Sequence, residues 1–113
     1  MPTWKKSPPE LVERFRGLVA NLSEATQRPM FGYPTCVLGG HMFVGLHEDH
    51  LILRLPEDDR RRFVDVVGGT IFEPMPGRPM REYVVAPTEL VDDPAIDEWV
   101  GRAYAYARTL PAK

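Results

Sequence analysis

The feature that most constrains this chain is the alternation of apolar and polar residues over 28–55, interrupted by Gly39-Gly40 and by Glu48-Asp49. Alternation with a period of two is typical of β-strands, and short glycine-rich or polar interruptions are typical of hairpin turns. The stretch therefore predicts an antiparallel meander of consecutive hairpins.

Two-residue turns also predict which residues lie opposite one another, and opposed residues share a face of the sheet. The predicted pairs are Leu38 with His41, Cys36 with Phe43, His47 with His50, and Phe43 with Arg54. One predicted face is almost wholly aliphatic and has to be buried, most simply against the first helix: Thr35, Val37, Met42, Val44, Leu46, Leu51, Leu53 and Leu55. The other face is mixed: Cys36, Leu38, His41, Phe43, Gly45, His47, His50, Ile52 and Arg54.

Helical periodicity lies on both sides of the meander. Ser7-Pro8-Pro9-Glu10 is typical of a capping box, which predicts a helix that begins there and ends near Ala25. Its apolar stripe is Leu11, Phe15, Leu18, Val19 and Leu22. Asp93-Pro94 predicts the start of a last helix that runs to about Thr109. Its stripe is Ile96, Trp99, Val100, Ala103, Ala107 and Leu110.

The segment between the meander and the last helix predicts three smaller elements. A short helix follows Pro56 and ends at Gly68-Gly69. Two strands, over 70–73 and 81–86, are joined by a loop at 74–79 whose three prolines and one glycine predict an exposed, irregular path. We therefore predict one α+β domain over 1–113, with a polar tail at 1–6 and a helix at each end.

Composition limits the classes of function. The 113 residues carry a formal net charge of −2, so we expect nucleic acid to be an unlikely partner. Apolar runs fall far short of the ~20 residues of a membrane helix, and the chain opens with no signal-peptide pattern. We expect a cytoplasmic protein without membrane contact, and the single cysteine, Cys36, fits a reducing compartment.

Several short motifs, taken in order, resemble the N-terminal domain of the TfoX/Sxy family, bacterial proteins associated with the regulation of natural competence. The resemblance spans roughly 11–110 and rests on Arg28-Pro29-Met30-Phe31-Gly32, Gly40 with Met42-Phe43, Leu51-Ile52-Leu53-Arg54, Pro79-Met80 with Tyr83, and Asp93-Pro94 with Trp99 and Ala103. Full-length members have two domains, so the chain is expected to be a stand-alone N-terminal domain. The resemblance implies a regulatory or interaction module and supplies no catalytic residue.

Three side-chain groups invite a chemical interpretation. His47 and His50 are predicted to face each other at a hairpin tip, where two nitrogens alone make an incomplete metal site. Cys36 and His41 lie diagonally across a hairpin without a third, orienting group. The acids before the Arg60-Arg61-Arg62 run can pair with its arginines on a solvated helix. We expect no catalytic residue, metal or cofactor.

The mixed face is the candidate interaction surface, because apolar residues with a polar edge are typical of interfaces. It comprises Leu38, His41, Phe43, His50, Ile52 and Arg54. The leading prediction is a non-enzymatic protein-interaction or regulatory module that binds an unknown protein or a second copy. Two alternatives stay open for this face: the last helix covers it, or it forms a small-molecule or metal site in which His41, Phe43 and Arg54 join the 74–79 loop.

Overall fold

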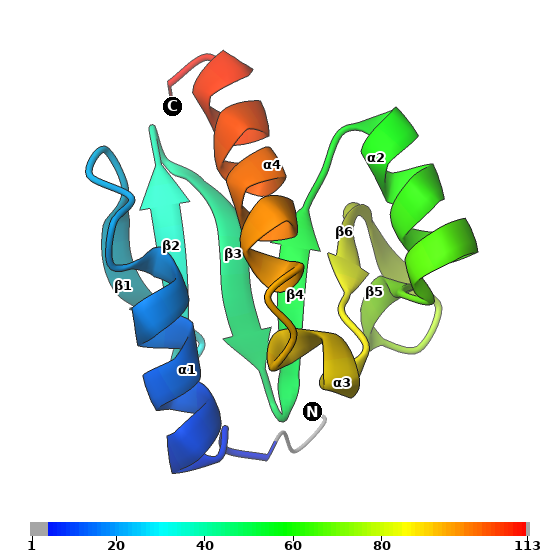
Figure 1. Cartoon of the computed structure of the whole chain (residues 1–113), viewed down its shortest axis with the longest axis horizontal. Helices are drawn as coiled ribbons and strands as arrows, with labels where there is room; N and C mark the ends of the chain where they lie inside the picture. The colour runs from blue at the N-terminus through cyan, green and yellow to red at the C-terminus, as the bar shows by residue number, and fades with distance from the viewer. Residues whose placement is uncertain (1–4, 113) are drawn as a thin grey trace.

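The predicted meander forms the centre of a six-stranded antiparallel sheet (Figure 1). The computed structural model describes residues 5–112; the first four residues of the predicted polar tail and Lys113 lie outside the described residues. In chain order the strands are β1 (Thr26–Met30), β2 (Tyr33–Leu38), β3 (His41–His47), β4 (His50–Arg54), β5 (Thr70–Met75) and β6 (Arg78–Val85). They lie side by side in the order β1-β2-β3-β4-β6-β5, so β1 and β5 form the two edges.

Strand β1 is an element that the sequence did not predict. The chain reverses direction at Phe31-Gly32, where φ is 54° and 84°, and β1 then pairs with β2. A turn with two left-handed residues normally has Asn, Asp or Gly at its first position. Because this turn has phenylalanine there, the sequence did not indicate a turn before β2. The predicted glycine turn is confirmed, because Gly39 and Gly40 have φ values of 59° and 87°.

A bulge in β3 changes the predicted register. The Leu38–His41 and His47–His50 pairs are confirmed, but Cys36 lies opposite Val44 and Val37 opposite Met42, which leaves Phe43 as an extra residue. The predicted Cys36–Phe43 pair is therefore wrong. Because a bulge shifts the alternation by one residue, Phe43 is buried in the same core as the aliphatic residues that follow it.

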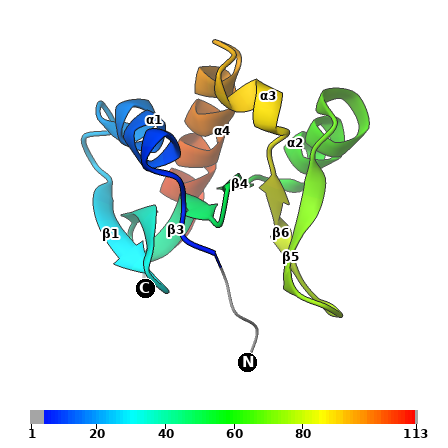
Figure 2. The same cartoon turned by 90° about the horizontal axis from the view of Figure 1, so that it is seen from below.

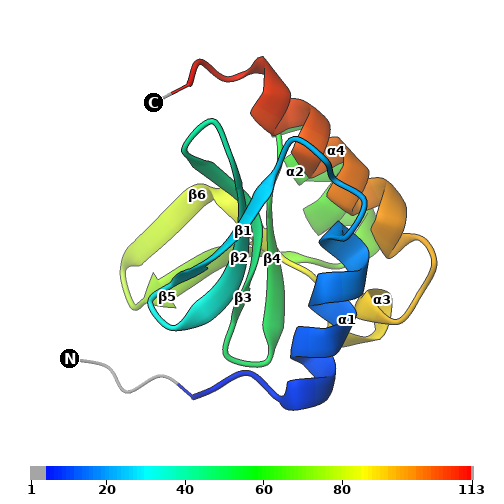
Figure 3. The ribbon, with the colours of Figure 1, turned by 90° about the vertical axis from the view of Figure 1, so that its left-hand side faces the viewer.

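Two long helices, α1 (Pro9–Val19) and α4 (Ile96–Thr109), cover one face of the sheet (Figures 2 and 3). Both are shorter than predicted. The capping box does not form, because the Ser7 hydroxyl donates to the Glu48 carbonyl oxygen at 2.6 Å. The Asp93 carboxylate accepts from the amide of Ala95 at 2.9 Å, and α4 begins only at Ile96.

The remaining elements lie around β5 and β6. The predicted short helix is α2 (Glu57–Arg62), which continues as a π-helical turn, η1 (Phe63–Val67), and ends at left-handed Gly68. A further helix, α3 (Thr88–Val91), was not predicted. The irregular 74–79 loop is also a correction: β5 and β6 run through Pro74 and Pro79, and only Pro76-Gly77 forms a turn. Pro74 is tolerated because β5 is an edge strand, and Pro79 because β4 pairs only with residues 83–85 of β6. Over residues 5–112, no helix combines the length and apolarity needed to cross a membrane.

Candidate functional site

A small apolar cavity lies on the face of the sheet opposite α1 and α4, which we call the open face. Its volume is about 80 Å³, and all six strands contribute to its wall. The wall includes Met30 and Tyr33 from the β1–β2 hairpin, Met42 and Ile52 from the centre, and Phe72 and Met80 from the β5–β6 hairpin. Strands β1 and β5 are opposite edges of the sheet, so the sheet must curl for both to reach one cavity. Figure 2 shows the two outer hairpins on either side of the open face.

Three aromatic rings form one part of the wall. The ring centroid of His47 lies 5.2 Å from that of Tyr33 and 5.1 Å from that of Phe72. Burial lowers the pKa of His47, so its imidazole is neutral at pH 7. Burial also raises the pKa of the Tyr33 phenol, with the nearby Glu48 carboxylate adding to the effect. The wall therefore carries no formal charge at neutral pH.

Exposed apolar side chains extend the cavity into a groove. Phe31 is 80% exposed and Met80 is 37% exposed, and both belong to the cavity wall. They come from the β1–β2 turn and from β6. We refer to the cavity together with these two rim residues as the apolar groove. Large apolar side chains that remain exposed around an apolar cavity are typical of a surface that another molecule covers.

The six residues of the predicted interaction surface are not brought together. Phe43 is fully buried, and its ring lies 5.5 Å from that of Tyr104 on α4. Leu38 packs against the same core. The last helix therefore covers the predicted mixed face at Phe43 and Leu38, which was one of the two alternatives left open for that face. Ile52 is buried in the wall of the apolar groove on the other side of the sheet, and His50 lies at the β3–β4 tip.

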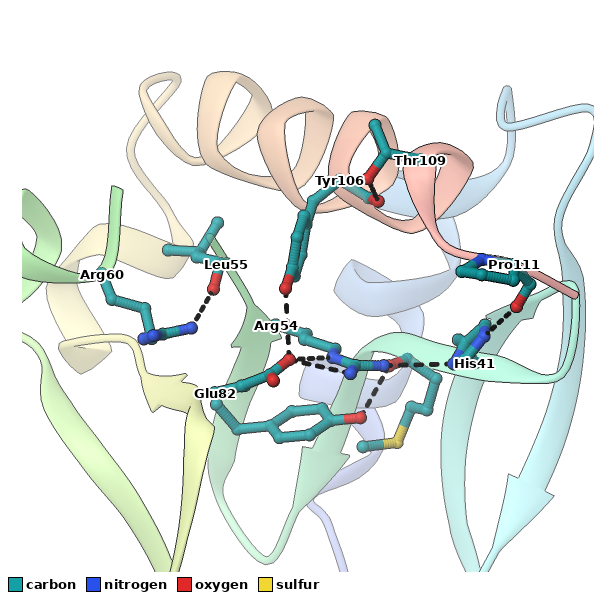
Figure 4. Close-up of polar contacts among 10 residues, drawn as sticks. His41, Arg54, Leu55, Arg60, Glu82, Tyr106, Thr109 and Pro111 are labelled. Atoms are coloured by element: carbon teal, nitrogen blue, oxygen red, sulfur yellow. Dashed lines mark hydrogen bonds and ion pairs between the residues drawn. The ribbon is translucent and has the colours of Figure 1, made fainter. Parts of the chain in front are cut away.

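The other two residues of that surface, His41 and Arg54, belong to a polar cluster under the end of α4 (Figure 4). Arg54 donates from Nε to Glu82 at 2.8 Å and from a terminal nitrogen to His41 Nδ1 at 3.2 Å. Since Nδ1 accepts, the proton of His41 sits on Nε2, which donates to the Pro111 carbonyl oxygen at 2.6 Å. Tyr106 donates to the same Glu82 oxygen at 3.3 Å. Every charge in this Arg54 cluster is paired, which fits a structural role.

The side chains considered for metal binding and for thiol chemistry have surroundings that indicate a structural role. His50 Nε2 lies 3.4 Å from Asp49 at the hairpin tip, while His47 packs between aromatic rings. Among residues 5–112, no three His, Cys, Asp or Glu side chains are placed to share a metal ion. Cys36 is buried opposite Val44, and burial raises the pKa of its thiol, which disfavours the reactive thiolate.

The arginine run makes contacts within the domain. Arg60 donates to the Leu55 carbonyl oxygen at 2.7 Å, and Arg61 pairs with Glu57 at 3.1 Å as its spacing predicted. The guanidinium of Arg62 lies 5.9 Å from the centre of the Trp99 ring. These contacts engage all three arginines with their own chain.

Sequence reasoning missed most of the groove because its parts are far apart in the chain. Only Ile52 of the predicted surface belongs to it. One local signal was available: Phe31 precedes a glycine between two strand-like segments, which is the position of a tight turn. An aromatic residue there is exposed unless something covers it.

The fold and the site together define a small α+β domain with a curled antiparallel sheet, a helical layer on one face and an apolar groove on the other. The chain belongs to the TfoX N-terminal domain family, whose model matches residues 17–107. This confirms the resemblance found in the motifs. No curated protein and no solved structure matches the chain.

Proposed function

We propose that this domain is a non-enzymatic protein-interaction module whose partner contributes an extended segment with one apolar or aromatic side chain to the apolar groove. The observation that supports this most directly is the pair of exposed side chains, Phe31 and Met80, at the rim of an uncharged cavity. The regulatory role associated with the family would then act through binding. A single buried thiol is consistent with a cytoplasmic location.

The size of the cavity favours a side chain over a small-molecule cofactor. Sites for drug-sized ligands usually enclose ~300–1,000 Å³, and an engineered cavity of ~150 Å³ admits benzene. A cavity of about 80 Å³ takes part of one side chain. The remaining contact area has to come from the rim, which is how an interface anchors one residue in a pocket.

The backbone at Phe31 supports the same interpretation. A left-handed φ of 54° costs a phenylalanine stability that asparagine or glycine would not lose. Strained, exposed residues are retained where they contribute to function. In this position Phe31 stands at the rim of the groove.

The test is a selection of random peptides on the immobilised domain, followed by affinity measurements on the enriched sequences. We expect enriched peptides to share an apolar or aromatic residue. Phe31→Asp and Met80→Asp should each weaken their binding at least tenfold, because each places a charge at an apolar contact. Both residues are exposed, so the variants are expected to fold.

Val66→Asp is the matched control, since Val66 is 78% exposed but lies on η1, away from the groove wall. It should leave affinity unchanged. Equal losses in all three variants, or selection without enrichment, would contradict the proposal. If light scattering shows a dimer for wild type that dissociates in Met80→Asp, the occupant of the groove is a second copy of this chain and not a segment of another protein.

A further inference from the structure

The two outer hairpins, which Figure 2 shows on either side of the open face, carry the same tripeptide. Arg28-Pro29-Met30 ends β1, and Arg78-Pro79-Met80 begins β6. Both methionines belong to the groove wall. Because side chains alternate along a strand, the arginine two positions before each methionine lies on the same face as that methionine. Each outer hairpin therefore places one arginine beside the apolar groove.

Cross-strand pairing supports this placement for Arg28. It lies opposite Thr35, a residue of the groove wall, and paired residues share a face. The Thr35 hydroxyl donates to the Arg28 carbonyl oxygen at 2.5 Å, which holds this part of β1 against the wall. On the other hairpin, Arg78 lies opposite Met75, next to the turn at Pro76-Gly77. Both arginines therefore extend from ordered strand backbone.

The guanidinium groups of Arg28 and Arg78 make no ion pair or hydrogen bond with any other residue of 5–112. Both residues are exposed. The arginines of the helical layer differ from them, since Arg16, Arg102 and Arg108 each pair with a carboxylate. A chain with a net charge of −2 thus keeps two unpaired positive charges beside its apolar groove.

Two carboxylates also lie near the groove, and a backbone amide compensates part of the charge of each. Glu48 accepts from the amide of Lys5 at 2.9 Å, and Glu73 accepts from the amide of Gly77 at 3.1 Å. Both acids line a second hollow of about 330 Å³, which shares Phe72 with the groove wall. The two arginines, in contrast, offer their full charge to a partner.

The separation of the two arginines fits a short extended segment. Four steps between neighbouring strands separate β1 from β6, which would be about 19 Å in a flat sheet. The curl of this sheet reduces that distance, and long arginine side chains shorten the gap further. Five extended residues span about 13 Å from the first Cα atom to the last. Acidic residues two positions before and after an anchor side chain share its face and come within reach of both arginines.

We propose that the apolar groove selects an acidic protein segment, in which one apolar side chain enters the cavity and flanking carboxylates pair with Arg28 and Arg78. This inference rests on the proposed function and adds to it the charge of the partner. Complementary charges around an apolar anchor speed association and exclude basic segments. Because both arginines are exposed, each ion pair changes the affinity only about two- to fivefold.

Four synthetic peptides of equal length test the charge preference by fluorescence polarisation. Three have a central leucine and differ at the positions two residues before and after it, which are both glutamate, both glutamine or both lysine. The fourth keeps the glutamates and has serine at the centre. We expect the glutamate–leucine peptide to bind best, the glutamine peptide several-fold more weakly and the lysine peptide at least tenfold more weakly. The affinity of the glutamate–leucine peptide should also fall as salt rises, because salt screens exposed charges.

Charge-reversed variants locate the preference. Arg28→Glu and Arg78→Glu should each weaken binding of the glutamate–leucine peptide several-fold, and the double variant should prefer the lysine–leucine peptide. Arg61→Glu is the matched control, because it makes the same change of charge at an exposed residue of α2, outside the groove wall. It should leave the order of affinities unchanged. Equal affinities of the three leucine peptides for wild type, or an equal loss in Arg61→Glu, would overturn the proposal.

The same peptides separate this inference from the proposed function. If the three leucine peptides bind equally and the serine peptide does not bind, the interaction module holds and its acidic preference is wrong. If the serine peptide binds as well as the glutamate–leucine peptide, the groove takes no part in binding, and the proposed function and this inference both fail. Both also fail if none of the four peptides binds.

Discussion

Phe31 combines two properties that each lower stability, an exposed aromatic ring and a left-handed backbone. The following residue, Gly32, also has a positive φ, so the turn has the geometry that Asn-Gly adopts most readily. Phenylalanine is therefore the wrong residue for this turn on backbone grounds alone. The apolar contact that its ring offers at the rim of the groove, in the proposed function, accounts for its presence.

We expect Phe31→Asn to raise the free energy of unfolding by about 0.5–1 kcal/mol, because asparagine adopts the left-handed conformation at lower cost. The same variant should weaken binding of selected peptides. Chemical denaturation checks the first effect, with Phe31→Leu as the control that keeps the backbone cost. A loss of more than about 1 kcal/mol in Phe31→Asn would assign the ring a structural role instead.

His47 predicts a dependence of stability on pH. Burial lowers its pKa in the folded protein below the value of about 6.5 expected in the unfolded chain. The unfolded chain therefore binds more protons in the window between these two values, and stability rises with pH through it. As pH falls below about 6.5, we expect the free energy of unfolding to decrease progressively.

Replacing the ring isolates this effect. His47→Phe keeps an aromatic side chain between Tyr33 and Phe72 but cannot be protonated. Denaturation at pH 7.5 and pH 5.5 should show a smaller difference for His47→Phe than for wild type. An unchanged slope in His47→Phe would assign the pH dependence to other groups.

At the scale of elements, two glycines with different surroundings give opposite expectations. A Cβ atom at Gly69 would lie 2.3 Å from the Phe63 ring and 2.9 Å from the Val85 carbonyl oxygen. A Cβ atom at Gly101, on the exposed side of α4, meets nothing within 4 Å. Gly69 thus sets how closely η1 approaches β6, while Gly101 is free to change.

We expect Gly69→Ala to lower the free energy of unfolding by about 2–3 kcal/mol, because a buried ring and the backbone have to move. Gly101→Ala should raise it by about 0.5–1 kcal/mol through helix propensity. Thermal unfolding of the two variants provides the comparison. A mild effect of Gly69→Ala would mean that η1 moves easily against the sheet.

The elements that the sequence predicted correctly are those with local signals. Glycine pairs marked the β2–β3 turn and the end of η1, and helical periodicity marked α1 and α4. The errors occur where tertiary contacts override such signals. Ser7 bonds to the β3–β4 turn instead of capping α1. Pro74 lies in the edge strand β5, and Pro79 lies in β6 outside the part, 83–85, that pairs with β4.

The site was harder to predict than the fold for a geometric reason. One bulge at Phe43 was enough to bury part of the predicted surface under α4, and a bulge leaves no mark in an alternating pattern. The groove also needs the sheet to curl until its two edges approach one cavity. Curling depends on strand twist and bulges summed over the whole sheet, which no single motif encodes.

At the scale of the whole molecule, the Arg54 cluster holds the helical layer to the sheet. Arg54 on β4 and Glu82 on β6 form its centre, Tyr106 joins it from α4, and His41 links it to the chain end at Pro111. The Arg54 side chain is only 18% exposed, and its guanidinium also faces the rings of Tyr83 and Tyr106. Breaking the ion pair would leave this charge poorly solvated.

A double-mutant cycle with Arg54→Met and Glu82→Gln measures the coupling between the two charges. Since Glu82 is 43% exposed, solvent screening limits the expected coupling to about 1 kcal/mol at pH 7. The exposed Arg61–Glu57 pair on α2 is the matched control and should give at most about 0.5 kcal/mol.

Measuring the coupling energy at low pH distinguishes an electrostatic interaction between Arg54 and Glu82 from a packing effect. The hydrogen bond from Arg54 lowers the pKa of Glu82 below its unfolded value, so the stabilisation is present above that unfolded value and is lost as pH falls through the folded one. The coupling should therefore persist in the range below about pH 6.5 in which His47 takes up its proton, and disappear only in stronger acid. A coupling that stays constant down to pH 2 would mean that shape, not charge, joins Arg54 to Glu82.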